Sequence, residues 1–340
     1  MTRNPQIAMA TAPSFARSIR LVRRICRVAG RPNLIDDARV GLARHGVIAA
    51  VQRHDTATIF DWLIDAFSFQ GVSDNIAYGY MEQHGRVRWH DIAGALAELP
   101  SCSKLRCYWA FADCGNRKNA DSCANSKHRP TCPLPRHDLR NGRLNQTAYS
   151  LFLFMRDVAK SDFVGWIDRR LAAVDLVPAP ERPARLRQAL LEPLGNIYGV
   201  SNKVLAMALA ELLLGGDAKR PIWVEAGTVM IAIDTLVHNF LHRTGILRDL
   251  RAEHAYGTGC YAPSGCAAII ERIASKIDAR DFNPAYPANF PRFVQHALWQ
   301  FCAESGLNRC NGRRIDDRAP CEQADCPIFE SCARVALKPA

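Results

Sequence analysis

The stretch IYGVSNKVLAMALAELLLGG, residues 197–216, decides the fold class of this chain. A glycine-containing turn is followed directly by an apolar run long enough for a buried helix. Ser201 can cap the start of that helix, and Gly215 and Gly216 can end it. No alternating strand pattern and no internal repeat stands out, so we predict an all-α protein. Apolar residues recur at helical spacing in three further segments, 58–67, 231–246 and 290–304.

Size and charge limit what the protein can be. With 340 residues, of which 48% are hydrophobic, the chain can form two domains with buried cores. Its formal net charge is +11 at pH 7. A surplus of this size favours a polyanionic partner, and nucleic acid fits better than a membrane surface. The alternative is a basic surface that serves only solubility.

No secretory signal or membrane span stands out in the sequence. The first residues lack the apolar run and the small-residue cleavage site of a secretory signal, and no 18 consecutive residues are apolar. We therefore expect a cytoplasmic, nucleoid-associated protein without a membrane contact. Because the cytosol keeps thiols reduced, metal ligation is a better expectation for the 13 cysteines than disulfide bonds.

The N-terminal segment, residues 1–35, contains seven arginines and no acidic residue. Three interpretations remain open: a basic arm that contacts phosphates, an organelle-type transit peptide, or a poorly defined start. We favour a basic arm or a mobile start.

Four cysteines near the end of the sequence have the spacing C-x10-C-x4-C-x5-C. Thiolates suit zinc and iron–sulfur clusters alike, but zinc sites usually contain a tight C-x2-C pair, which this segment lacks. A Cys-Pro step, such as that at Cys326, is typical of iron–sulfur loops. The spacing favours an iron–sulfur cluster, with zinc and free thiols as the alternatives. The four residues are Cys310, Cys321, Cys326 and Cys332. The nearby Cys302 is expected to be a buried apolar side chain.

A second cysteine-rich segment, residues 99–143, interrupts the helical pattern with prolines and glycines. Such a segment cannot form a conventional core, so a bound metal is the expected cross-link. Zinc and a second iron–sulfur cluster both remain possible. The candidate ligands are Cys102, Cys114, Cys123 and Cys132; Cys107 is then spare, and His128 or His137 can replace one ligand.

Two charged residues stand where they could take part in chemistry. Lys203 lies in the first turn of the helix after Gly199, where backbone N–H groups can bind a phosphate, although a solvated lysine is the simpler interpretation. Asp234 stands among apolar residues at a helix start, where it can cap the helix or act as a functional carboxylate. It shares a helix face with His238 and His242 at a spacing that can bind zinc, but such histidine pairs are more often structural.

These segments resemble the helix-hairpin-helix DNA glycosylase superfamily, in particular its endonuclease III and adenine glycosylase branch. In that family the hairpin has the sequence motif L-P-G-V-G-x-K-x-A. A helix with the motif V-D-T-H follows, and then a cysteine loop that ends in a C-P-x4-C motif. The resemblance covers roughly residues 57–98 and 145–335. The matching positions are Gly199, Val200, Lys203, Asp234, Thr235, Arg243 and Thr244.

The resemblance implies a two-lobed helical fold, an iron–sulfur loop and a catalytic pair. Asp234 would stabilise the positive charge that develops on the sugar, and Lys203 would form a Schiff base with it. Gln70 would enter the duplex where the base has left, unless it only caps a helix end. Residues expected to contact DNA are Gln70, Gly199, Ser201, Arg140 and Arg143.

We therefore predict a monomeric enzyme of DNA repair, a glycosylase with abasic-site lyase activity that binds double-stranded DNA and removes a damaged base. Ser201 and Leu236 differ from the family's residues, so a non-catalytic iron–sulfur protein that senses damage or redox state on the same scaffold is the alternative. A cluster enzyme unrelated to DNA is a further rival. The expected lobes are residues 57–234, with the cysteine-rich insert 99–143, and residues 36–56 plus 235–340, with the cluster loop 302–332.

Overall fold

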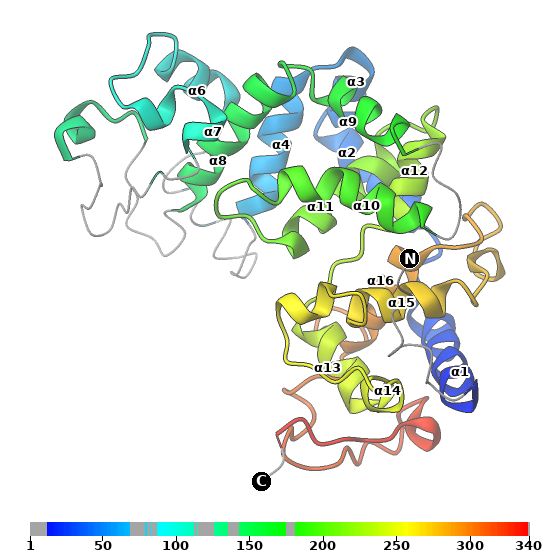
Figure 1. Ribbon diagram of the computed structural model, residues 1–340. Coiled ribbons are helices and arrows are strands. Elements are labelled where there is room, and N and C mark those ends of the chain that lie inside the picture. Colours follow the sequence, from blue (N-terminus) through cyan, green and yellow to red (C-terminus); the bar gives the residue numbers. More distant parts are fainter. Residues whose placement is uncertain are drawn as a thin grey trace. The chain divides into compact units, whose positions relative to one another are not determined.

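The computed structural model describes residues 12–68, 79, 82, 87–111, 114, 126–134, 143–174 and 181–338. These residues form helices and no strand, which confirms the all-α prediction (Figure 1). The chain divides into two compact units. Unit 1 consists of Met1–Leu34 and Gly227–Ala340, and unit 2 of Ile35–Ala226. Unit 2 is therefore one continuous insertion into unit 1. Residues 36–56, which we expected beside the C-terminal half, belong to unit 2.

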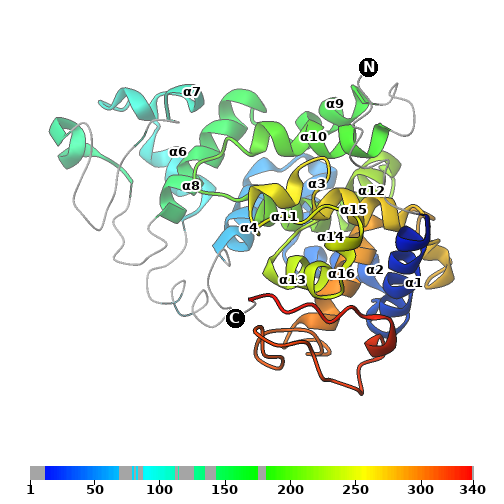
Figure 2. The ribbon, with the colours of Figure 1, turned by 60° about the horizontal axis from the view of Figure 1, so that its bottom comes forward.

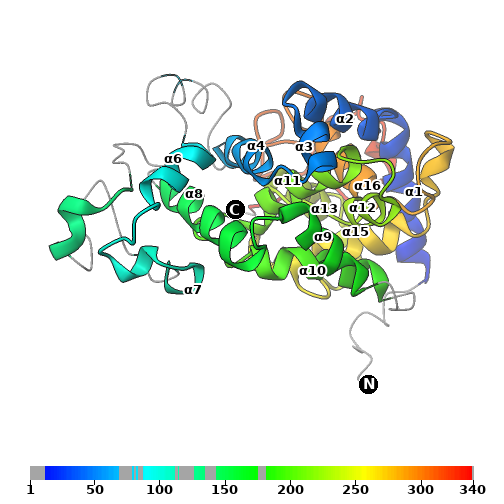
Figure 3. The same ribbon diagram turned by 90° about the horizontal axis from the view of Figure 1, so that it is seen from above.

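Unit 2 is built around α4 (Thr56–Ser68), which packs on α8 (Arg143–Leu153) and α11 (Asn202–Gly215) (Figure 3). Ile59, Phe60 and Leu63 are among the α4 residues that form the buried stripe expected from their spacing. The other helices of unit 2 are α2 (Leu34–Arg44), α3 (Val47–Arg53), α6 (Trp89–Ala95), α7 (Tyr108–Phe111), α9 (Phe163–Ala172), α10 (Arg182–Leu194) and α12 (Pro221–Thr228). Its short helical turns are η2 (Ser103–Leu105), η4 (Ser126–Thr131) and η5 (Phe154–Val158).

Unit 1 has α16 (Pro291–Cys302) at its centre, and α1 (Ala12–Ala29), α13 (Thr235–Arg243) and α15 (Cys266–Ala274) pack against it (Figure 2). Pro291 at the first position of α16 favours a helix start because its fixed φ suits the helix and its missing N–H would be unpaired there. The remaining elements of unit 1 are α14 (Ile246–Asp249), η6 (Thr258–Tyr261), η7 (Ala279–Asp281) and η8 (Phe329–Ser331).

The described part of the N-terminal segment is a packed helix. Residues 12–29 form α1, whose apolar stripe is buried while its arginines occupy the rest of its surface. Arg17 fixes the outer face of the helix, because it donates hydrogen bonds to the Asp249 carboxylate at 2.8 Å and to the Thr244 carbonyl at 3.0 Å. A helix with so strong an apolar stripe is stabilised by packing even where its charge suggests solvent exposure. The buried residues are Leu21, Val22, Ile25, Cys26 and Ala29.

Two helix starts follow from local sequence. The hydroxyl of Ser201 accepts a hydrogen bond from the Val204 N–H at the start of α11, and the Asp234 carboxylate accepts one from the Val237 N–H at 2.9 Å at the start of α13. Each side chain satisfies a backbone donor that the helix itself leaves unpaired. Among the described residues, no helix has the length and the apolar character needed to cross a membrane.

Candidate metal centre

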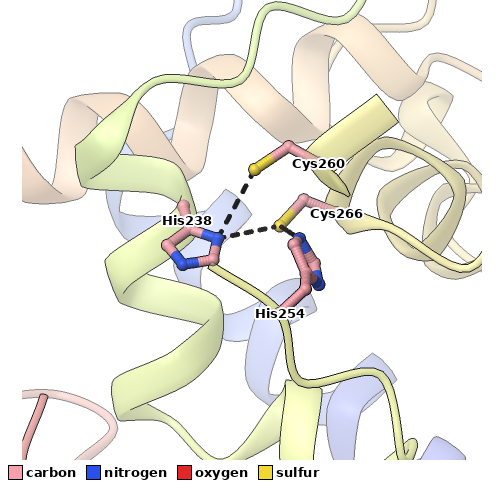
Figure 4. Close-up of side chains that lie close together, drawn as sticks. All are labelled: His238, His254, Cys260 and Cys266. Carbon is pink, nitrogen blue, oxygen red and sulfur yellow. Dashed lines mark hydrogen bonds between the residues drawn. The ribbon is translucent and has the colours of Figure 1, made fainter. Parts of the chain in front are cut away.

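Two histidines and two cysteines of unit 1 meet in one group, formed by His238, His254, Cys260 and Cys266 (Figure 4). Their donor atoms all lie within 4.8 Å of one another. His238 Nδ1 is 3.4 Å from Cys266 Sγ and 3.5 Å from Cys260 Sγ, and Cys266 Sγ is 3.4 Å from His254 Nε2. A group of this composition and size could hold a metal ion.

Different elements position the four side chains. His238 projects from α13, one turn after the Asp234 cap, and only 5% of its surface is exposed. His254 lies in the loop after α14, Cys260 lies in η6, and Cys266 is the first residue of α15. Three of the ligands thus come from a single turn-rich segment, and α13 supplies the fourth.

The loop folds tightly enough to bring its ligands together because glycine precedes each cysteine. A Cβ atom on Gly265 would lie 2.1 Å from the Gly259 carbonyl oxygen, and one on Gly259 would lie 3.1 Å from the His254 ring. The first distance is shorter than any tolerable contact between these atoms. The two glycines therefore allow the backbone near Cys260 to approach both His254 and the start of α15.

Hydrogen bonding fixes which nitrogen of His254 is available. Its Nδ1 lies 2.7 Å from the Ala252 carbonyl oxygen, so Nδ1 carries the proton and donates it. Nε2 then faces Cys266 with a free lone pair. A carbonyl that holds the distal ring nitrogen in this way is the usual outer partner of a metal-binding histidine.

Burial controls the ionisation of the group. Together with the charges of His254 and His242, it lowers the pKa of His238 to about 4, so the ring is neutral at pH 7. Burial also raises the pKa of the Cys266 thiol well above its ordinary value, and the adjacent Cys260 adds to this effect. A bound cation would oppose that increase, because it stabilises thiolates directly.

This group was not predicted from the sequence. His238 was grouped only with Asp234 and His242, and no role was predicted for His254, Cys260 and Cys266. The signal was present, since HAYGTGCYAPSGC, residues 254–266, has three ligand-type residues in a segment rich in glycine and proline. Residues 99–143 contain more cysteines and the same residue types, and the metal site was predicted there instead.

The four C-terminal cysteines of the predicted cluster loop, all of them described, do not form a group as close as that at His238, but their thiols influence one another electrostatically. Burial, with a smaller contribution from the thiols of Cys310, Cys326 and Cys321, raises the pKa of Cys332 to about 11. The pKa of Cys326 is raised in the same manner, by burial first and then by Cys310 and Cys321.

A buried arginine lies beside these thiols. Arg243, at the end of α13, is 1% exposed and donates from Nη2 to the Asp317 carboxylate at 2.7 Å. Its Nε and Nη1 have no hydrogen-bond partner among the described residues. A thiol hydrogen bond from Cys302 lowers the pKa of Cys310, and the charge of Arg243 lowers it further. Cys302 is fully buried, as expected, but it acts here as a donor as well as an apolar group.

The residues of the predicted catalytic pair lie in different units. Lys203 is half-buried in the first turn of α11 in unit 2, after Gly199, whose φ of 78° is left-handed. The exposed Ser201 caps the same helix. Asp234 is half-exposed at the start of α13 in unit 1, and its charge raises the pKa of Tyr256 and Tyr261 after burial has raised both.

Several predicted residues lie outside the part of the chain that is described. Gln70, Arg140 and Cys123 are among them, and the side chain of Arg143 is as well. Within the insert, a hydrogen bond of 3.0 Å between the hydroxyls of Ser101 and Thr131 brings the neighbours of two predicted ligands together. The described Cys102, Cys114 and Cys132 do not form a group of the size found at His238.

Comparisons with known proteins return no relative for this chain. No family model matches it, and neither a curated protein nor a solved structure does.

Proposed function

We propose that this protein is a DNA glycosylase with abasic-site lyase activity. The observation that carries the proposal is an ordered series of features along the chain. A lysine-bearing helix follows a glycine turn, a second helix starts at a capping aspartate, and a four-cysteine loop comes last. Unit 1 contains both chain ends and the capping aspartate, whereas the inserted unit 2 contains the lysine. The resemblance to helix-hairpin-helix glycosylases predicts this same order.

The connection between α10 and α11 supports a phosphate contact. The two helices pack against each other and are joined by residues 195–201, with Gly199 in the left-handed conformation. Glycine adopts this conformation without the steric cost that a Cβ atom brings. The turn leads directly into the N-terminus of α11, where backbone N–H groups and the helix dipole favour an anion.

The surroundings of Asp234 support a role in stabilising positive charge. One carboxylate oxygen is held by the Val237 N–H, and the preceding residues Val229–Ile233 are buried. The carboxylate is therefore fixed before any substrate arrives. A fixed negative charge lowers the barrier to a step in which positive charge develops nearby, because no reorganisation is required.

The C-terminal thiols fit a [4Fe–4S] cluster. Cys310, Cys321, Cys326 and Cys332 are close enough for their charges to interact, and the Arg334 N–H lies 3.4 Å from Cys332 Sγ. Arg243 offers two further buried N–H groups beside Cys310 that suit a negatively charged cluster. When bound, such a cluster would cross-link the loop and fix its arginines, and no bond of the substrate would be broken at iron.

A basic hollow of unit 1 supports the choice of DNA as partner. Arg17, Arg20 and Arg24 of α1 line it together with residues 330–332 of the cysteine loop. Arg20 and Arg24 are exposed. Exposed arginines beside a rigid loop can bind phosphate groups bidentately.

In the proposed reaction, Lys203 Nζ attacks C1′ of the sugar as the bond between C1′ and the base breaks, and the base leaves with a proton. Asp234 stabilises the positive charge on the sugar during this step. Ring opening then gives a Schiff base between Lys203 and C1′, and loss of the 3′ phosphate by elimination nicks the strand.

Borohydride trapping tests the proposal without knowledge of the damaged base. A duplex with a single abasic site supplies the aldehyde with which Lys203 condenses, with loss of water, and borohydride reduces the imine to a stable amine. We expect a covalent protein–DNA adduct on a denaturing gel for the wild type and its loss in Lys203→Ala. Lys219→Ala is the matched control, because Lys219 is an exposed lysine of the same unit.

Three outcomes are decisive. An adduct that persists in Lys203→Ala and disappears in another lysine variant would contradict the assigned nucleophile. No adduct from wild-type protein that still binds the duplex would contradict lyase activity and favour the non-catalytic DNA-binding alternative. No binding to the duplex at low salt would contradict the proposed partner altogether.

A further inference from the structure

We propose that His238, His254, Cys260 and Cys266 bind one Zn²⁺ ion in a closed tetrahedral site that stabilises residues 252–266. Neither the glycosylase proposal nor the predicted iron–sulfur cluster requires this site. It also shares no ligand with the four cysteines of the C-terminal loop.

The distances match a tetrahedron around zinc. With Zn–S near 2.3 Å and Zn–N near 2.0–2.1 Å, the edge between a nitrogen and a sulfur ligand is about 3.5 Å. Three of the four nitrogen–sulfur distances in the group are 3.4, 3.5 and 3.4 Å. All remaining pairs of donor atoms lie within 4.8 Å, as one central ion requires. The ligands therefore already have the spacing that zinc needs.

The donor set selects the class of metal. Two imidazole nitrogens and two thiolates suit zinc, whereas magnesium and calcium prefer oxygen ligands. Two histidines and two cysteines can also hold a [2Fe–2S] cluster, but the histidines then bind one iron and the cysteines the other. In this group His238 Nδ1 is within 3.5 Å of both sulfur atoms, which leaves no room for two irons.

Four protein ligands leave no open position on the ion, so the site is structural rather than catalytic. The loop that the ion would close contains little secondary structure that could stabilise it, since residues 252–265 contain only the short η6 helix. The side chain of Tyr261 also ties this loop to the segment before Asp234, because the Ile233 N–H donates to the Tyr261 hydroxyl at 3.0 Å. Loss of the ion would therefore loosen the backbone that leads to Asp234.

Metal analysis of the full-length protein, purified without added metal, tests the proposal. We expect one zinc per chain in the wild type, counted separately from iron by mass spectrometry. Cys260→Ser and Cys266→Ser should each lose that zinc and retain their iron. Cys26→Ala is the matched control, because it removes a buried thiol of unit 1 that lies in α1 and should leave the zinc in place.

X-ray absorption at the zinc edge of the wild type adds a test that does not depend on variants. We expect a first shell of two sulfur and two nitrogen atoms. A shell of four sulfurs, or zinc that persists in both serine variants, would assign the zinc to another cysteine group and overturn the proposal. A folded wild-type protein without zinc that also fails to bind added Zn²⁺ or Co²⁺ would overturn it as well.

These outcomes are distinguishable from those of the trapping experiment. Zinc content and ligand type are measured without DNA, so a failure of the glycosylase proposal leaves them unchanged. Conversely, a protein that forms the Lys203 adduct but binds no zinc would contradict only the present inference.

Discussion

Burial controls the protonation of two histidines in unit 1. His238 has a pKa of about 4, and His296 on α16 has a pKa of about 3, in each case chiefly because the low-dielectric surroundings disfavour the charged ring. The nearby positive charges of Arg292 and Arg31 add to the effect at His296. Its Nδ1 has no hydrogen-bond partner among the described residues. Both rings are therefore neutral in the folded protein near pH 7.

His296 makes the folded protein sensitive to acid. The pKa of His296 is about 3 in the folded protein, and its ordinary value of 6.5 applies to the unfolded chain. Between pH 3 and pH 6.5 the unfolded chain therefore binds a proton that the folded chain does not. Stability is thus complete above pH 6.5 and falls as the pH falls toward 3. At pH 5 the loss from this residue is about 2 kcal/mol.

Chemical denaturation at pH 7.5 and pH 5 checks this prediction. The wild type should lose about 2 kcal/mol more between the two conditions than His296→Gln does. His45→Gln, which changes an exposed histidine, should behave as the wild type. An equal loss in His296→Gln would show that the acid sensitivity arises elsewhere.

At the level of elements, the turn between α10 and α11 depends on one backbone conformation. Gly199 has a φ of 78°, in a region where a Cβ atom clashes with the following carbonyl. The exposed Gly94 in α6 presents the opposite case, because a Cβ atom there would meet nothing within 4 Å and the helix favours alanine.

Replacing these glycines should have opposite effects. Gly199→Ala should lower the free energy of unfolding by about 1–2 kcal/mol and weaken binding to an abasic-site duplex. Gly94→Ala should raise the free energy of unfolding by about 0.5–1 kcal/mol and leave DNA binding unchanged. Urea denaturation and a binding titration measure both quantities. Normal stability and affinity in Gly199→Ala would contradict the role of this turn.

At the scale of the whole molecule, the net charge of +11 would favour the proposed association with DNA. Displaced counterions make such binding weaken steeply as salt increases. The exposed arginines of α1 are the described residues best placed to contribute, because they line the hollow beside the cysteine loop.

The salt dependence of DNA binding should therefore be steep. We expect the affinity for duplex DNA to fall at least about tenfold between 50 and 200 mM salt. Arg20→Ala should reduce the slope of log affinity against log salt by about 1. Arg44→Ala, which removes an exposed arginine of unit 2, should change it less. A slope near zero would favour the rival in which the cysteines serve an enzyme unrelated to DNA.

Much of the fold follows from neighbours in the sequence. The helices at α4, α11, α13 and α16 lie where the apolar spacing predicts them. Ser201 and Asp234 begin their helices because a capping side chain needs only a backbone donor three residues away. By contrast, α1 lies in the segment that was predicted to be a basic arm or a mobile start, because its arginines were given more weight than the apolar residues that pack on α16.

The sequence by itself determined the helical class, the starts of these helices and the presence of many metal-binding side chains, because each depends on residue type and short spacing. Only the tertiary structure decided which ligands meet. His238 and Cys266 are 28 positions apart, and their side chains come together because α13 and α15 both pack against α16. Residues that meet through packing can be separated by any number of positions in the sequence. The candidate metal centre therefore could be identified only from the folded chain.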